Sequence, residues 1–387
     1  MTLTAGRPVV PAPRSGRPPR PGGRQIVGLA GLGVALAATA TLLVLSPETR
    51  QPAGPAAPPT VAEVWPDAER ADIPGGLADG PLYSPVYFLD AQTSLGIAPG
   101  PDGTTQRLVI RAADGAVREL RRLRADTTPQ FGGFVRAGDE VAWAESVSGD
   151  DGMASTQMWI ANVVTGGAPR LLTGDTGDVV LFNSQYDMVI AGGRLHWVSV
   201  SPEDETATEV RSVSLAGGPV SVRDEPGAWA LSAWPWLVSA GSGQTGPVQL
   251  RNLESGQVTT VEAAESELAT CGPAWCRVLV LAGDAPSRID LMRPDGGDRQ
   301  RVAGGAATAS IIDVAVLDRF EVLSQSSGDQ SAPISPQQLL LYDLREKQVV
   351  VVADGVGVVQ ARGGVLWWST GDNETTTWHT LDLRTLE

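Results

Sequence analysis

The sequence predicts an all-β protein, and three observations lead to that expectation. From about Gly80 onward no stretch shows sustained helical periodicity, whereas short runs of β-branched residues alternate with turn residues. One hairpin pattern, VQLRNLESGQVTTV at 248–261, recurs in altered form at 107–120, 158–172, 210–222, 288–302 and 339–352, and is truncated at 378–387. Finally, a lone hairpin is only marginally stable in water, so these units must pack against one another.

Each hairpin is preceded by a second pair of short strands, which makes a unit of four strands. These pairs lie at 85–98, 134–146, 188–200, 229–240, 268–281, 311–324 and 358–370. The hairpin turns are separated by 51, 51, 39, 40, 50 and 39 residues. Repeats of about 40–50 residues with four strands each are typical of a β-propeller. We therefore expect a seven-bladed β-propeller over residues 60–387, with six or eight blades as the alternatives.

Closure of the ring needs one more strand. The seventh unit ends at Glu387 after its third strand, which would leave an open sheet edge. Residues 60–65, TVAEVW, are rich in β-branched residues and lie just before the first unit. We expect them to pair with residues 378–383 and to close the ring.

The N-terminal part divides into three segments. Residues 1–25 are rich in Pro, Gly and Arg and are expected to form a disordered, basic cytoplasmic tail. Residues 26–45 are uncharged and mostly apolar, long enough for a single transmembrane helix, and the arginines before them place the N-terminus inside. Residues 46–59 form a Pro/Ala-rich linker, so the propeller would be extracytoplasmic at the cell membrane. The alternative is a signal peptide cleaved near Ala38-Thr39-Ala40, although cleavage there would leave an apolar new terminus.

Charge and cysteine usage restrict the partners and the compartment. The formal net charge is −15; residues 1–50 hold six arginines and one acid, which leaves 23 basic and 43 acidic residues beyond them, a net charge of −20. Nucleic-acid binding is therefore disfavoured.

Cys271 and Cys276 lack the spacing of zinc or redox motifs. We expect a hairpin disulfide if the segment lies outside the cytoplasm, and two free buried thiols if it does not.

The sequence offers no convincing catalytic, cofactor or metal site. Residues 241–246 spell the GxGxxG dinucleotide pattern, but Pro247 and a strand follow them rather than the helix that such a site requires. His196 and His379 lie far apart in two predicted strands. Asp150 and Asp151 lack the alternating ligands of a calcium loop. We predict no cofactor and no bound metal, and expect a non-enzymatic protein rather than an enzyme.

Eleven tryptophans are present. Four of them, Trp143, Trp197, Trp236 and Trp367, fall at comparable points of second strands and are expected to pack between blades. Others lie near strand ends or turns, where exposed aromatic rings bind carbohydrate or protein. From these we take Trp234 and Trp275, together with Trp236 of the Trp234-Pro235-Trp236 run, as a possible surface anchor.

The chain resembles the TolB-like β-propellers, and more closely the single-pass, membrane-anchored propeller proteins of high-GC bacteria. The resemblance rests on the apolar segment and its Pro-rich spacer, the four-strand repeats and the TCGPAWCRVLV hairpin at 270–280. It implies a cell-surface protein that acts through binding. The expected function is therefore a non-enzymatic scaffold that contacts a protein partner, in envelope assembly or sensing. The alternative is a ligand-binding or enzymatic propeller acting on cell-wall glycans through its central mouth; an enzyme would gather acids or histidines at one end of the channel.

Overall fold

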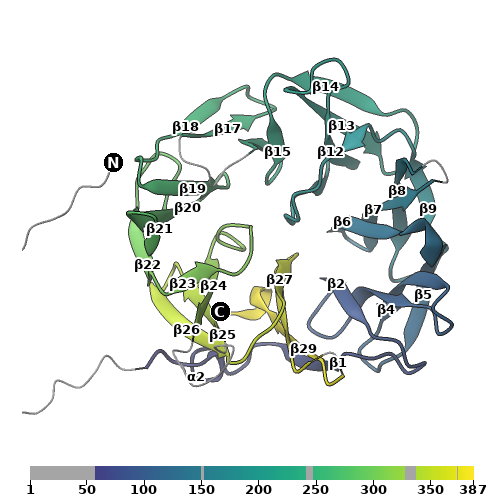
Figure 1. The fold of residues 1–387 in the computed structure, drawn as a ribbon, viewed down its shortest axis with the longest axis horizontal. Coiled ribbons are helices and arrows are strands. Elements are labelled where there is room, and N and C mark those ends of the chain that lie inside the picture. The colour runs from purple at the N-terminus through teal and green to yellow at the C-terminus, as the bar shows by residue number, and fades with distance from the viewer. Residues whose placement is uncertain (1–56, 150–151, 241–246, 327–336, 373) are drawn as a thin grey trace, which may run out of the picture. The chain divides into compact units, whose positions relative to one another are not determined.

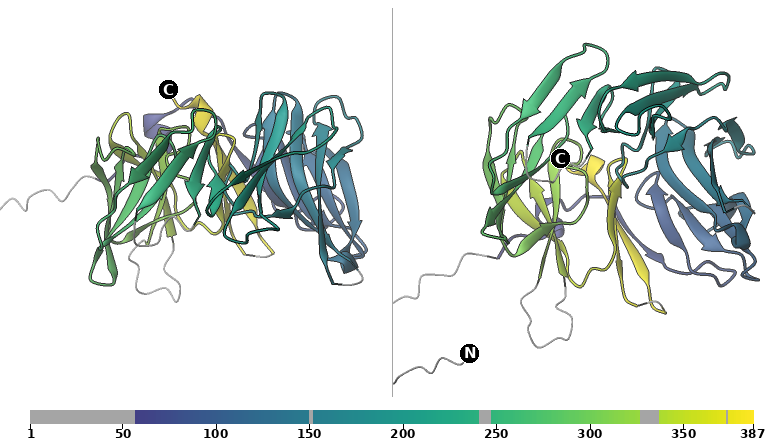
Figure 2. Two further views of the ribbon diagram at one scale, coloured as in Figure 1. Left: turned by 90° about the horizontal axis from the view of Figure 1, so that it is seen from above. Right: turned by 45° about the horizontal axis from the view of Figure 1, so that its top comes forward.

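The described residues fold into seven antiparallel sheets arranged as blades around a central channel (Figure 1). Blades 1 and 2 consist of β2 (Ser84–Phe88), β3 (Ser94–Pro99), β4 (Thr105–Arg111) and β5 (Val117–Arg124), and of β6 (Gln130–Ala137), β7 (Glu140–Ser148), β8 (Ala154–Asn162) and β9 (Arg170–Thr173). In blade 3, β10 (Asp178–Val179) and β11 (Met188–Ala191) both pair with β12 (Arg194–Val200), which is followed by β13 (Thr208–Ser214) and β14 (Ser221–Glu225). Seen from the side in Figure 2, the blades stand beside one another around the channel.

The remaining blades follow the same plan. Blade 4 holds β15 (Trp229–Leu231), β16 (Trp236–Ser239), β17 (Val248–Asn252) and β18 (Val258–Val261), and blade 5 holds β19 (Glu267–Cys271), β20 (Cys276–Ala282), β21 (Ala285–Met292) and β22 (Gln300–Gly304). Blade 6 holds β23 (Ala307–Ala309), β24 (Phe320–Ser326), β25 (Gln337–Asp343) and β26 (Gln348–Ala353), and blade 7 holds β27 (Val359–Arg362), β28 (Val365–Thr370), β29 (Thr377–Asp382) and β1 (Arg70–Pro74). Three short helices complete the described chain, α2 (Val61–Val64), η1 (Ala125–Thr127) and η2 (Leu383–Thr385). The seven-bladed prediction is confirmed.

The hairpin at 248–261 forms the outer half of blade 4, as its sequence predicts. Val248 pairs with Val261, and both side chains are buried. In the turn, the side-chain oxygen of Asn252 accepts hydrogen bonds from the backbone N–H groups of Glu254 and Ser255. Gly256 closes the turn with a φ of 72°, a left-handed conformation that favours glycine.

The core consists of clusters between neighbouring blades rather than one central mass. Trp143 and Trp197, both fully buried, belong to the clusters between blades 1 and 2 and between blades 2 and 3. Trp367, 1% exposed, packs with Phe88 of blade 1 at a ring distance of 5.2 Å. Interblade packing is thus confirmed for these three residues. A middle strand such as β12 is covered on both faces, so successive residues along it are buried. An outer strand such as β14 is mostly exposed.

The ring closes through a different N-terminal strand from the one that the sequence predicts. It is β1, not residues 60–65, that lies beside β29 and pairs with it (Figure 1). Ile73 lies opposite Trp378. Ile73 is 2% exposed and packs with Phe88 and Trp367, so β1 also joins blade 7 to blade 1. The prediction that an N-terminal strand closes the ring is confirmed, and the prediction that residues 60–65 form this strand is wrong.

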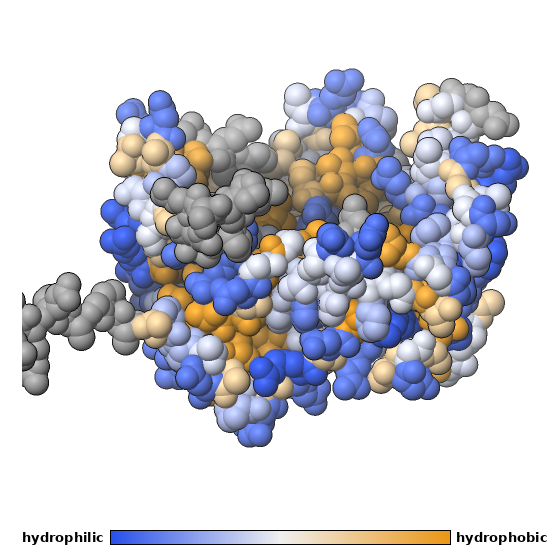
Figure 3. Space-filling view, turned by 60° about the horizontal axis from the view of Figure 1, so that its bottom comes forward, coloured by the Kyte–Doolittle hydropathy of each residue, from blue (hydrophilic) through white to orange (hydrophobic). Residues whose placement is uncertain are grey.

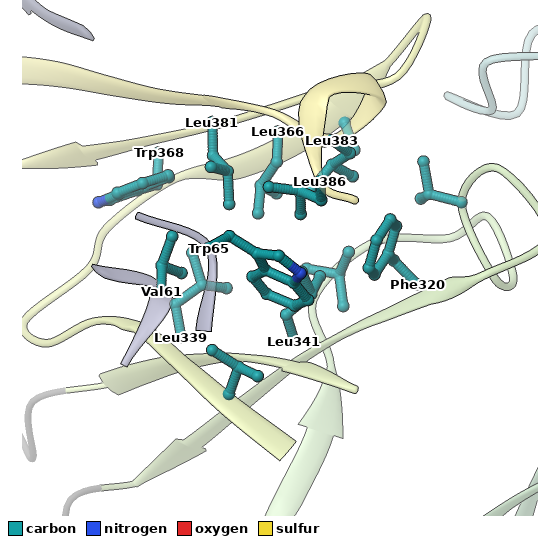
Figure 4. Packing of buried hydrophobic residues seen from close by; sticks show 14 of the residues in the cluster. Val61, Trp65, Phe320, Leu339, Leu341, Leu366, Trp368, Leu381, Leu383 and Leu386 are labelled. Carbon is teal, nitrogen blue, oxygen red and sulfur yellow. The ribbon is translucent and has the colours of Figure 1, made fainter. Parts of the chain in front are cut away.

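Residues 60–65 form a helical turn because their polar groups favour one. The Glu63 carboxylate accepts hydrogen bonds from both the backbone N–H and the hydroxyl of Thr60, at 2.7 and 2.9 Å. These two bonds hold Glu63 against the residue before the helix, which favours a helix start over the strand that the β-branched composition suggests. The turn buries Val61 and Trp65 between blades 6 and 7, where Trp65 meets Phe320 edge to face at 5.8 Å (Figure 4).

The structure describes residues 57–149, 152–240, 247–326, 337–372 and 374–387. Residues 58–387 form one unit that contains all the blades. The predicted tail at 1–25, the transmembrane helix at 26–45 and most of the linker lie outside the described residues. Within the described ranges, no helix is long and apolar enough to cross a bilayer.

Candidate functional site

A segment of blade 3 reaches across the inside of the ring. The chain between β10 and β11 places Ser184 against the loop of blade 6, where its hydroxyl and the backbone N–H of Gln185 donate to the two carboxylate oxygens of Asp313, at 2.6 and 3.0 Å. Arg362 of blade 7 donates to the carbonyl of Ser184 at 3.1 Å and to the side-chain oxygen of Asn183 at 2.9 Å. Blades 3, 6 and 7 are thereby joined at the channel.

Burial perturbs the ionisable groups at this crossing. Burial raises the pKa of Asp313, although the hydrogen bonds from Ser184 and Gln185 and the charges of Arg362 and Arg277 oppose that rise. Burial likewise raises the pKa of Asp187 and lowers the pKa of Arg362, whose charge Asp187 and Asp313 support. The charged groups at the crossing therefore face groups of opposite charge or hydrogen-bond donors, and each carboxylate oxygen of Asp313 already accepts one hydrogen bond.

The loop of blade 6 that carries Asp313 presents an apolar side chain to the channel. Ala315 and Val316 anchor the loop, because they are 2% and 1% exposed and belong to the cores on either side of blade 6. The next residue, Leu317, is 48% exposed, and so is Ile312. Ala315, Leu317 and Asp318 have φ values of 50°, 57° and 55°, left-handed conformations that non-glycine residues rarely adopt.

Blades 4, 5 and 6 and the crossing segment enclose a cavity of about 400 Å³, which we call the channel cavity. Its walls include Phe182 and Tyr186 of the crossing segment, Pro273 and Trp275 of blade 5, and Leu317 and Asp318 of blade 6. A volume of this size lies in the range of small-ligand sites, which are lined mainly by apolar groups with a few polar ones. Hydrophobic surface is also visible in the central hollow of the ring, bordered by polar residues, from the side shown in Figure 3.

Two acids and no base line the channel cavity. Asp313 and Asp318 are the charged residues among the described residues that line it. No side chain in the described ranges donates a hydrogen bond to the carboxylate of Asp318, which is exposed. Burial, with the charges of Asp313 and Asp318, raises the pKa of Tyr186 to about 12, so its hydroxyl stays protonated at neutral pH. The cavity therefore has a negative charge beside apolar walls.

None of the three predicted anchor tryptophans is an exposed ring, and they differ in their relation to the cavity. Trp275 lines it and is 6% exposed, with the guanidinium of Arg293 over its ring at 3.7 Å. Trp234 is half-buried, and its ring lies 3.8 Å from that of His196 with the two planes tilted by 34°. Its neighbour Ala233 lines the cavity. Trp236 is half-buried in β16. Of the three residues Trp275 alone is part of the described cavity lining, and the exposed apolar contact comes from Leu317.

The cysteine hairpin forms part of the cavity wall. Cys271 and Cys276 are joined by a disulfide and face each other across β19 and β20. The turn that they close contains Gly272 to Trp275, all of which line the cavity. The predicted disulfide is present in the structure, and it holds this wall in place.

The other sequence candidates do not form a centre. His196 is buried and His379 hydrogen bonds to Asp72 and Thr370, and they lie on blades 3 and 7. The described residues contain no group of three or more His, Cys, Asp or Glu that could hold a metal ion. The GxGxxG stretch at 241–246 and Asp150-Asp151 lie outside the described residues.

Sequence reasoning missed the residues that make the site. The run at 311–324 was expected to hold two strands, but β23 ends at Ala309 and residues 310–319 form the loop that carries Asp313, Leu317 and Asp318. The apolar alternation of that run resembles a strand. Its partners on the crossing segment are well over a hundred residues away, so no local signal could have shown the contact.

Comparison with known proteins shows the fold. No family model and no curated protein matches the sequence. The chain is similar to a puromycin-hydrolysing peptidase from Mycobacterium tuberculosis (TM-score 0.50, 13% identity, 85% of this chain and 54% of that one). It is also similar to prolyl oligopeptidase B from Galerina marginata (TM-score 0.50, 10% identity, 79% of this chain and 49% of that one). This chain therefore spans about half the length of these two peptidases.

TolB from Acinetobacter baumannii is another structural neighbour (TM-score 0.34, 13% identity, 74% of this chain and 79% of that one). At such identities these likenesses say nothing about activity. The sheet topology shows an all-β, seven-bladed propeller in the described residues, and the two peptidase structures are its neighbours at a TM-score of 0.50.

Proposed function

We propose that this chain is a non-catalytic interaction propeller that binds a protein partner at the channel cavity. The observation that carries the proposal is Leu317, an apolar side chain left 48% exposed on the cavity wall although Ala315 and Val316, the two residues before it in the loop, are buried. Leaving such a group in water is unfavourable, and a partner that covers it would gain from its burial. The left-handed φ of Leu317 belongs to the tight turn that a hydrogen bond from the backbone N–H of Arg319 to the carbonyl of Val316 closes at 3.2 Å, and this turn presents the side chain on the loop.

We further propose that the propeller lies outside the cell membrane, anchored by residues 26–45, and acts there in envelope assembly or sensing. The apolar composition of that segment and the arginines before it support the orientation. A disulfide between the two cysteines suits an oxidising compartment. The acidic composition of the region after residue 50 argues against nucleic acid as the partner.

A binding role suits the cavity better than catalysis does. General acid–base chemistry needs groups free to exchange protons with a substrate. Asp313 already accepts two hydrogen bonds, and the described residues lining the cavity include no histidine. Asp318 remains as a charge without an obvious catalytic neighbour, which fits recognition.

Proximity labelling with the full-length chain in living cells tests the proposal. Labelling by wild type is compared with a Leu317→Asn variant, which removes the apolar group, and with Val258→Asn as a control. Val258 is 49% exposed on β18, away from the cavity lining. We expect one or more proteins that wild type and Val258→Asn label and Leu317→Asn does not. Equal protein labelling by all three, or labelling of glycans alone, would overturn the proposal.

A further inference from the structure

Resting on the proposed function, we infer that the channel cavity takes a basic side chain of the partner protein, an ammonium or guanidinium, flanked in the partner by apolar residues. The inference concerns the chemistry of the partner segment, and it stands on three features of the cavity: its charge, its apolar wall and its rigidity.

The charge of the cavity is uncompensated at Asp318. Its carboxylate receives no hydrogen bond from the described residues, whereas neighbouring charges are paired: Arg319 binds Asp343 at 2.7 Å, and Arg277 binds Glu321 behind the wall. Arg277 and Arg362 reach Asp313 and the crossing segment but do not line the cavity. An acidic or phosphorylated partner segment would meet two carboxylates and no cation among the described lining residues, whereas a basic one would be attracted.

The apolar wall restricts what can carry the cation. Leu317 and Ile312, each 48% exposed, lie in the same loop as Asp313 and Asp318. A small, fully hydrated cation would leave these side chains in water. A basic side chain has an apolar stem, and apolar neighbours in the same segment would cover both leucine and isoleucine while the charged end meets Asp318.

The wall is held in the conformation that such a segment would meet. The indole N–H of Trp275 donates to the backbone carbonyl of Asp318 at 3.2 Å, and the backbone N–H of Ala315 donates to the Glu321 carboxylate at 2.9 Å. The disulfide between Cys271 and Cys276 fixes the turn that carries Trp275. A fixed surface loses little conformational entropy on binding, which favours recognition of a short segment.

Panning of a random heptapeptide phage library on the immobilised full-length chain tests the inference. We expect enriched peptides to contain Lys or Arg next to apolar residues, and the strongest of them, made as a free peptide, to bind more weakly as salt concentration rises. Asp318→Asn should weaken that peptide roughly fivefold at low salt and remove most of the salt dependence. Leu317→Asn should weaken it by a similar factor at every salt concentration.

Asp284→Asn is the matched control for the charge. Asp284 is also exposed, accepts no side-chain hydrogen bond from the described residues and lies in the turn between β20 and β21 of blade 5, so its replacement removes the same charge away from the cavity lining. Enriched peptides that are acidic or uncharged, no enrichment on wild type over Leu317→Asn, or equal weakening by Asp284→Asn and Asp318→Asn would overturn the inference. If cellular labelling still depends on Leu317 while the peptides are not basic, the inference fails and the proposed function stands. If labelling does not depend on Leu317, the proposed function fails.

Discussion

The hydroxyl of Ser184 donates a 2.6 Å hydrogen bond to the carboxylate of Asp313, although 129 residues separate the two along the chain. The bond ties a segment of blade 3 to the loop of blade 6, and the same segment borders the channel cavity. Because this contact fixes one side of the cavity, it connects the stability of the ring to the shape of the candidate site.

Replacing Ser184 by alanine tests this connection. The variant leaves one oxygen of the buried Asp313 carboxylate without its donor, so we expect a loss of about 1–2 kcal/mol in the free energy of unfolding. Urea denaturation measures the change. Ser266→Ala, at an exposed position, is the control and should stay within about 0.5 kcal/mol of wild type. Equal stability of the two variants would show that the crossing contact adds nothing.

Ring closure by β1 predicts a large effect at Ile73. Ile73→Ala removes a buried side chain that packs against Phe88 and Trp367, so we expect about 2–4 kcal/mol of destabilisation. Val258→Ala, at a half-exposed position of an outer strand, should cost far less. Thermal unfolding of wild type, Ile73→Ala and Val258→Ala measures both effects. A loss of stability in Ile73→Ala no larger than that in Val258→Ala would contradict closure by this strand.

The helical turn at 60–65 should also contribute to stability, although it is not a strand. Trp65 is 5% exposed and meets Phe320, so Trp65→Ala should cost about 3–5 kcal/mol. Glu63→Gln keeps the shape of the side chain and weakens only its contact with Thr60, so it should cost below about 1 kcal/mol. Chemical denaturation that ranks the two variants in the opposite order would contradict this packing.

The disulfide should stabilise the propeller modestly, because it closes a short loop. Loop-closure entropy for about six residues corresponds to about 2 kcal/mol. We expect the Cys271→Ala, Cys276→Ala double variant to unfold at lower denaturant concentration by that amount, and wild type to match it in a reducing agent. A reducing agent that leaves the stability of wild type unchanged would contradict the presence of the bond.

His196 predicts a loss of stability on acidification. Burial lowers its pKa below the usual value of about 6.5, so the unfolded chain binds a proton that the folded chain does not. Its contribution is therefore fully present above about pH 6.5 and declines as the pH falls below that value towards the lowered pKa. His196→Phe keeps an aromatic ring against Trp234 and removes the titration. Melting temperatures of the two proteins should diverge between about pH 7 and 5; parallel curves would refute the assignment.

Most of the fold could be predicted from sequence because its strands are local. The hairpin at 248–261 and the pair at 229–240 carry their own turn residues, so their positions follow from short-range pattern. The closing strand could not be assigned because Thr60 and Glu63 begin a helix in a segment whose composition favours a strand. The site could not be assigned because Ser184, Asp313 and Leu317 acquire their roles through contacts between blades, which leave no periodic signal.

The Leu317→Asn variant tests the central claim most directly, when its unfolding free energy and its labelling of the partner are measured together. Asparagine tolerates the left-handed φ of 57°, so the account predicts stability equal to that of wild type or up to about 1 kcal/mol higher, together with loss of partner labelling. A variant that is less stable than wild type and labels the same proteins would contradict the account, because Leu317 would then serve the fold and not the partner.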